Sequence, residues 1–280
     1  MNLHLPGSID DPGPDFVALA RAHGLVPEAP STPVGDRLPI THGTTVVAIR
    51  YADGVVMAGD RRATAGNFIS HRAIEKVFPA DRHSGVAIAG AAGPAMEMVK
   101  LFQLQLEHYE KVQGTQLSLE GKANQLGQMV RGNLPAAMQG LAVVPIFAGY
   151  DVRRRAGRLF QYDVTGGRYE ESNYATSGSG GSLAGSVIKM GFVDGLVRDA
   201  AVDLAITALF EAADEDSATG GPDMVRGIYP VIATITADGF DRLADEEIAE
   251  RFVALLETLS SRATSHRVPE TSSETRGGPR

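Results

Sequence analysis

The stretch HGTTVVAIRYADGVVMAGDRR, residues 42–62, decides the fold of this chain. Two apolar runs, TTVVAIRY and GVVMAGD, are separated by Ala52, Asp53 and Gly54, and the glycine suits the tight turn of a hairpin. Short apolar runs bounded by turn residues and rich in valine are typical of buried strands. The stretch therefore predicts the opening hairpin of a buried sheet.

The composition of the chain argues against several classes of function. With 280 residues, 43% of them hydrophobic, the chain can bury a full core. No run of 18 apolar residues and no secretory signal is found, so neither a membrane span nor export is predicted. The net charge of −8 argues against nucleic-acid binding. The chain has no cysteine and no paired histidine ligands, so we expect no metal site or disulfide and favour a reducing cytoplasm.

The chain divides into three parts. Residues 1–43 carry seven of the fifteen prolines and one short helical patch at 15–23, so this leader is not expected to build a core of its own. Residues 261–280 are polar and predicted to be disordered. The body at 44–260 alternates blocks of strands with blocks of helices, the last helix being predicted at 245–256. Segregated blocks favour an α+β layered domain, in which helix layers flank an antiparallel double sheet.

Thr44 is the candidate nucleophile. An N-terminal threonine carries its own general base, the free α-amine, and needs no separate histidine. Thr44 becomes N-terminal only if the leader is removed. Gly43 suits that step, because self-attack on the preceding carbonyl requires a tight turn that glycine adopts most readily. Thr41 and Thr45 are less suitable as the new N-terminus. A chain that began at Thr41 would have glycine inside its first strand. A chain that began at Thr45 would need cleavage after Thr44, whose branched side chain resists the tight turn.

Two charged residues could assist that hydroxyl. Asp60 ends an apolar strand and Lys76 has apolar neighbours, at 60 − 44 = 16 and 76 − 44 = 32 residues after Thr44. A buried lysine beside a carboxylate could lower the pKa of the threonine hydroxyl and aid proton transfer. The glycine-rich segment AIAGAAG, residues 87–93, would suit an oxyanion hole of backbone N–H groups. The segments SGSGGS, residues 177–182, and DSATGG, residues 216–221, are weak signals in isolation.

Together, in this order and spacing, these segments resemble the proteasome β subunits, and most closely the actinobacterial type. The resemblance spans about residues 44–255. It implies a threonine endopeptidase with the four-layer αββα sandwich of N-terminal-nucleophile hydrolases, without a cofactor. By the same resemblance Thr44 is the nucleophile, released by autocatalytic cleavage between Gly43 and Thr44, with Asp60 and Lys76 as its charged partners.

The resemblance also assigns supporting residues. Gly90 would donate the oxyanion N–H, and Ser179, Asp216 and Thr219 would support the amine terminus, although many relatives have serine in place of Thr219. The substrate pocket would be lined by residues that are all uncharged: Ala63, Thr64, Ile74, Ile88 and Ala92. We therefore expect an apolar pocket that has nothing to pair with a charged side chain, and cleavage after large apolar residues.

The resemblance implies a set of partners. These are other β subunits in heptameric rings, rings of α subunits stacked against them, a ring-shaped ATPase, and substrates tagged with a ubiquitin-like modifier. Two alternatives stay open. One is the simpler bacterial ATP-dependent threonine protease, whose subunits generally lack a long leader and an extended C-terminal region. The other is a noncatalytic ring subunit, which would be expected to lack the threonine, aspartate and lysine set.

Overall fold

The computed structural model describes residues 15–23 and 43–265. Its helices are α1 (Phe16–Ala22), α2 (Ala92–Gln113), α3 (Leu119–Gly132), α4 (Leu134–Ala137), α5 (Gly181–Gly191), α6 (Arg198–Glu215) and α7 (Asp245–Ser265). Its strands are β1 (Thr45–Tyr51), β2 (Gly54–Gly59), β3 (Ala63–Ala65), β4 (Phe68–His71), β5 (Val77–Asp81), β6 (Ser84–Gly90), β7 (Val143–Asp151), β8 (Ala156–Tyr162), β9 (Arg168–Glu171), β10 (Tyr174–Gly178), β11 (Val231–Thr236) and β12 (Gly239–Arg242). The predicted α+β class is confirmed. In the described ranges no helix has the length and apolar character needed to cross a membrane.

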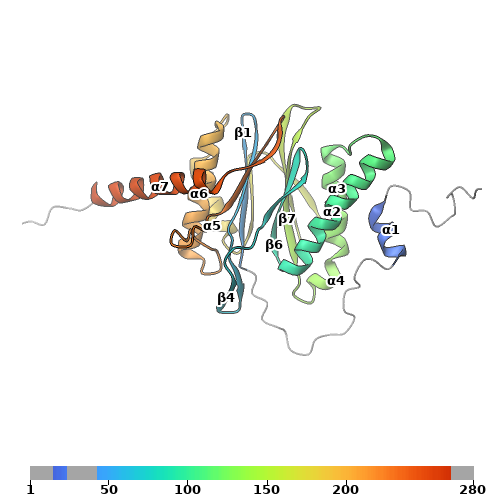
Figure 1. Ribbon diagram of the computed structural model, residues 1–280, viewed down its shortest axis with the longest axis horizontal. Helices are drawn as coiled ribbons and strands as arrows, with labels where there is room; N and C mark the ends of the chain where they lie inside the picture. Colours follow the sequence, from blue (N-terminus) through green and yellow to red (C-terminus); the bar gives the residue numbers. More distant parts are fainter. Residues whose placement is uncertain (1–14, 24–42, 266–280) are drawn as a thin grey trace, which may run out of the picture.

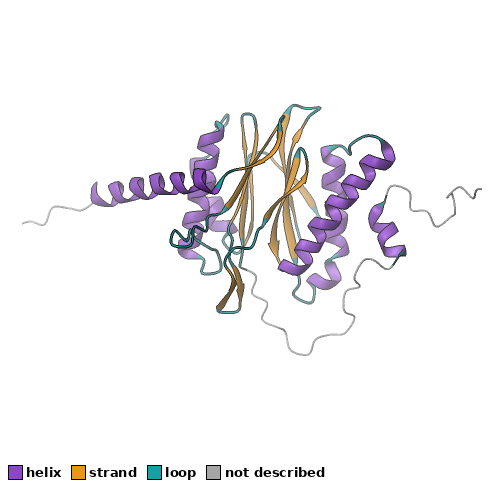
Figure 2. Ribbon diagram, viewed as in Figure 1, coloured by secondary structure: helices purple, strands orange, loops and turns teal. Residues whose placement is uncertain are grey.

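Two five-stranded antiparallel sheets lie face to face between helices (Figures 1 and 2). The first sheet has the order β10-β1-β2-β11-β12, and the second has the order β5-β6-β7-β8-β9. The predicted opening hairpin is the β1–β2 pair, in which Tyr51 lies opposite Gly54. A separate two-stranded hairpin, β3–β4, projects beyond the first sheet.

Strand β1 carries consecutive apolar residues from Val46 to Ile49 because both of its faces are covered. Val46 and Ala48 belong to the core between the two sheets. Val47 and Ile49 belong to a second core, which the first sheet forms with α5, α6 and α7. A strand buried on both faces loses the apolar–polar alternation of a half-exposed strand.

The outer face of the second sheet is covered by α2 and α3. Three phenylalanines form the centre of this third core: Phe102 of α2 packs edge-on against Phe147 at 5.8 Å, and Phe147 stacks with Phe160 at 6.0 Å. Aromatic pairs at these centroid distances contribute beyond the apolar area that they bury. Both sheets are thus enclosed on their outer faces by helices (Figure 1).

One helix boundary and one hairpin differ from the sequence-based expectation. Helix α7 continues to Ser265, nine residues past its predicted end at Leu256 and five residues into the predicted tail. The rest of that tail, residues 266–280, lies outside the described residues. The hairpin β3–β4 was not predicted, because β4 is exposed along its length and carries no apolar pattern.

The helical patch in the leader is helix α1. Asp15 caps its N-terminus by accepting a hydrogen bond from the Ala18 amide at 3.0 Å. Val17 and Ala20 are buried, and the ring centroids of Phe16 and His108 on α2 lie 5.5 Å apart. The leader was not expected to form a core of its own, and this part of it packs on α2 instead.

The close approach of the two sheets generates a stability prediction. A Cβ on Gly157 of β8 would lie 2.5 Å from the backbone oxygen of Gly54 in the other sheet. Gly157→Ala is expected to lower the free energy of unfolding by about 1–3 kcal/mol, because backbone must move to admit it. Gly93→Ala is the control: its Cβ meets nothing within 4 Å, and alanine favours the helix by up to about 1 kcal/mol. Urea unfolding of both variants checks this, and equal stabilities would contradict it.

Candidate active site

The hydroxyl of Thr44 lies against the peptide bond that joins it to Gly43. Thr44 directly precedes β1 and is buried, with 4% of its surface exposed. Its Oγ1 donates a hydrogen bond to the Gly43 carbonyl oxygen at 2.7 Å. The hydroxyl is thus held, away from bulk water, against the carbonyl group that it would attack in self-cleavage.

Asp60 and Lys76 form a buried ion pair beside this carbonyl. The Lys76 Nζ lies 2.7 Å from Asp60 Oδ1. It also donates to the backbone oxygens of Arg62 at 2.6 Å and Gly43 at 3.3 Å. The ammonium of Lys76 therefore contacts the same carbonyl oxygen as the Thr44 hydroxyl, and the structure brings the three predicted residues together.

Burial lowers the pKa of the Lys76 ammonium, and the Asp60 carboxylate opposes that shift. The ion pair is the reason that a charged lysine can be retained here, since an unpaired buried charge would be costly. A lysine whose pKa is lowered gives up and regains a proton more easily than an ordinary surface lysine. This property suits a group that assists proton transfer at a neighbouring hydroxyl.

Ser179, Asp216 and Thr219 lie on the other side of Thr44. The Thr44 amide donates to Ser179 Oγ at 3.3 Å. The hydroxyls of Ser179 and Thr219 both donate to Asp216 Oδ2, at 2.5 Å and 2.6 Å. Burial raises the pKa of Asp216, but these two hydrogen bonds and one from the Ala218 amide outweigh it, so the net pKa is lowered. Asp216 is thus held as a carboxylate that fixes both hydroxyls and orients that of Ser179 toward the Thr44 nitrogen.

Thr45 belongs to this network, although the sequence was interpreted only in terms of its competition with Thr44 for the N-terminus. Its hydroxyl lies 2.6 Å from Thr219 Oγ1, and its amide donates to Asp60 Oδ1 at 2.8 Å. A Cβ on Gly180 would come within 2.2 Å of the same hydroxyl. Thr45 therefore joins the Asp60 side of the site to the Asp216 side. The signal available in the sequence was the doubled threonine itself.

Gly43 occupies a position that leaves no room for a side chain. A Cβ at this position would lie 2.1 Å from the Ala218 Cβ and 2.3 Å from the Ala218 backbone oxygen. The expectation that the tight turn of self-attack selects glycine stays a prediction. Lack of space beside Ala218 is a second reason for glycine at this position.

A cavity of about 270 Å³ adjoins Thr44. Every predicted pocket residue lines it, together with Gly90: Ala63, Thr64, Ile74, Ile88 and Ala92. Gly90 has φ +114, and a Cβ there would lie 2.1 Å from the Ala142 oxygen, so this end of β6 requires glycine. Glu75 and His71 also line the cavity. The expectation that the pocket offers nothing to pair with a charged side chain is therefore corrected.

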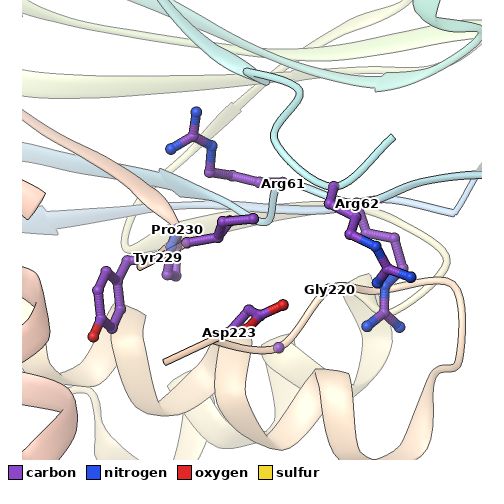
Figure 3. Close-up of a pocket in the computed structure, with 9 residues that line it drawn as sticks. Arg61, Arg62, Gly220, Asp223, Tyr229 and Pro230 are labelled. Atoms are coloured by element: carbon purple, nitrogen blue, oxygen red, sulfur yellow. The ribbon is translucent and has the colours of Figure 1, made fainter. Parts of the chain in front are cut away.

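Arg62 is a second residue that the sequence analysis did not single out. Its Nη1 donates to the backbone oxygens of Ser217 at 3.0 Å and Thr219 at 3.1 Å. Figure 3 shows Arg62 beside Gly220, at a smaller cavity that Thr44 does not line. Arg62 thus fastens the loop that carries Asp216 and Thr219 to the segment whose carbonyl accepts from Lys76. The feature of the sequence that could have indicated a role for Arg62 was its position two residues after Asp60.

Comparisons with known proteins agree on one family. A family model described as "Proteasome subunit" matches residues 40–226. The chain is 59% identical over 254 residues to "Proteasome subunit beta" of Acidimicrobium ferrooxidans, covering 90% of this chain and 92% of the relative. Proteins with the same name are 56% identical in Acidothermus cellulolyticus, covering 87% of each chain, and 53% identical in Streptomyces griseus, covering 90% and 92%.

The position of Thr45 generates a second prediction. Thr45→Val keeps the side-chain shape but removes the hydroxyl, which leaves the buried Thr219 hydroxyl with one partner fewer. We expect the free energy of unfolding to fall by about 1–3 kcal/mol. Thr45→Ser, which keeps the oxygen, should lose less. Urea unfolding of the two variants side by side measures this, and a valine variant as stable as the parent chain would contradict the assignment.

Proposed function

The chain belongs to the proteasome subunit family, and we propose that it is the proteolytic β subunit of a bacterial proteasome core particle, a threonine endopeptidase. One observation carries the proposal. The Thr44 hydroxyl lies 2.7 Å from the Gly43 carbonyl oxygen, and that oxygen also accepts a hydrogen bond from the Lys76 ammonium. The α+β arrangement of two sheets between helices supports the finer assignment to the αββα sandwich of N-terminal-nucleophile hydrolases.

The first reaction is removal of the leader, residues 1–43. Thr44 Oγ1 attacks the Gly43 carbonyl carbon, and the new C–O bond replaces the C–N bond as the proton passes from the hydroxyl to the nitrogen. Lys76 stabilises the negative charge that develops on the carbonyl oxygen. Water then hydrolyses the ester, which releases the Gly43 carboxylate and regenerates the hydroxyl. The product has a free α-amine on Thr44.

The second reaction is cleavage of substrates. The new α-amine, with an ordinary pKa of about 8, takes the proton from Thr44 Oγ1 as the hydroxyl attacks a peptide carbonyl. Ser179 already contacts the nitrogen of Thr44 and would orient the amine. The Gly90 N–H would bind the oxyanion. The peptide C–N bond then breaks as the protonated α-amine returns its proton to the departing amine, and water hydrolyses the resulting acyl-enzyme ester. We propose that the cavity beside Thr44 receives large apolar side chains, because alanine, isoleucine and leucine side chains are prominent in its lining.

The partners follow from the same proposal. The names of the relatives support assembly with other β subunits and with rings of α subunits, and we propose heptameric β rings. An ATPase ring would deliver proteins that carry a ubiquitin-like tag, and the site of action would be the cytoplasm. The leader would keep the nucleophile blocked until assembly, and residues 44–260 would form the mature catalytic domain, with the remaining tail outside it.

Leader removal gives the first test. Cleavage between Gly43 and Thr44 should leave 280 − 43 = 237 residues, because only this bond presents its carbonyl to the hydroxyl. Thr44→Ala should retain the leader and hydrolyse no peptide. Intact-mass analysis of the particle assembled with its α subunit checks both. A mature chain that begins at another residue, or a Thr44→Ala particle cleaved without any active subunit, would refute the mechanism.

Lys76 gives the second test. Lys76→Ala should slow leader removal and peptide hydrolysis by about 10²–10³, the usual effect of losing one electrostatic group at a reacting centre. The matched control is Lys122→Ala. Lys122 is also buried and paired with an aspartate, Asp81, but it lies away from Thr44. Both variants lose stability, so rates are compared on assembled particles. Equal loss of rate in the two would show that burial, not position at the site, explains the effect.

A further inference from the structure

The cavity beside Thr44 has a single carboxylate among its described lining residues. Glu75 directly precedes Lys76, and both line the cavity. The remaining charged or titratable lining groups are His71, Arg62 and Lys76. Lys76 is paired with Asp60, and Arg62 donates to backbone oxygens of the 217–219 loop. An unpaired Glu75 would therefore make this cavity attractive to lysine and arginine side chains.

Glu75 is paired by a residue that lies outside the cavity. Arg242, at the end of β12, places Nη1 2.6 Å from Glu75 Oε1. The two residues are 167 positions apart in the sequence, and Arg242 is not among the lining residues. The two side chains are 39% and 41% exposed, so the pair is partly screened by water. The Coulomb energy of the Glu75–Arg242 pair is therefore modest. The pair nevertheless neutralises the negative charge of Glu75 at the cavity wall.

We propose that Arg242 is a specificity-determining residue, which neutralises Glu75 and so keeps the pocket selective for apolar side chains. The inference rests on the proposed peptidase function and extends it to a residue that does not touch substrate. Without Arg242, Glu75 at the cavity wall loses the ion-pair partner that the structure gives it. A basic side chain that enters the cavity then acquires an ion-pair partner, whereas an apolar side chain gains nothing.

The test compares two fluorogenic peptides that differ only in leucine or arginine before the scissile bond. The quantity measured is the ratio of kcat/KM for the arginine peptide to kcat/KM for the leucine peptide, on assembled particles. Arg242→Ala should raise this ratio by about fivefold, the size expected from a partly exposed ion pair. Arg242→Lys should restore the parent ratio. Salt should shrink the difference, because it screens exposed charges.

Three further variants isolate the carboxylate. Glu75→Gln leaves the charge of Arg242 uncompensated, so the ratio should fall below that of the parent enzyme. The double variant Glu75→Gln/Arg242→Ala should lose the whole gain seen with Arg242→Ala. Arg226→Ala controls for loss of a cation elsewhere, because Arg226 pairs with Asp223, which does not line this cavity. It should leave the ratio unchanged.

The outcomes separate the two proposals. A parent particle that cleaves neither peptide overturns the proposed function, and this inference with it. A parent particle that cleaves peptides, with an unchanged ratio in both Arg242→Ala and Glu75→Gln, overturns the inference alone. A raised ratio that persists in the double variant also overturns it, since the gain would not come from Glu75. If Arg242→Ala does not assemble, Glu75→Gln decides, and a ratio that does not fall counts against the role of the pair.

Discussion

The buried carboxylate of Asp60 is the constraint on which the site depends. One oxygen accepts from the Thr45 amide and Lys76 Nζ, and the other accepts from the amides of Arg62 and Gly220. A fully buried charge is costly unless its lone pairs are satisfied, so these four donors must meet at one point. They come from the start of β1, the segment between β2 and β3, the residue before β5 and the loop after α6. Thr44, the proposed nucleophile, directly precedes Thr45, so its position follows from this meeting.

The two sheets contribute different halves of the site. The first sheet and its helices supply the residues around the Thr44 nitrogen: Ser179 lies at the junction of β10 and α5, and Asp216 caps the C-terminus of α6. The second sheet supplies the wall of the cavity through Ile88 and Gly90 at the end of β6. Because β2 and β6 both end beside Thr44, the residues around Thr44 and the wall of the cavity adjoin without a long loop. Rigid strand ends hold such groups more accurately than mobile loops do.

Crowding at the site explains its small residues. A side chain on Gly43 would collide with Ala218, and one on Gly180 would collide with the hydroxyls of Thr45 and Thr219. Gly220 leaves similarly little room, since its Cβ would lie 2.7 Å from the Arg62 Cβ. The glycines in these segments therefore serve close packing of backbone around the threonine nitrogen and carbonyl, in addition to any turn geometry. Their loss would displace the hydrogen-bond network that orients Thr44.

The sequence by itself determined the features that are local in the chain. These are the buried β1–β2 hairpin, the α+β order of elements, and Thr44, Asp60 and Lys76 as a set whose spacing resembles a known family. The tertiary structure alone decided what Thr45, Arg62 and Glu75 contact, and it revealed the lack of space beside Ala218 that excludes a side chain at Gly43. Thr45 meets Thr219 and Glu75 meets Arg242 across 174 and 167 residues. Such contacts depend on which strands pair and which loops meet, and no local pattern of polarity or spacing encodes that choice.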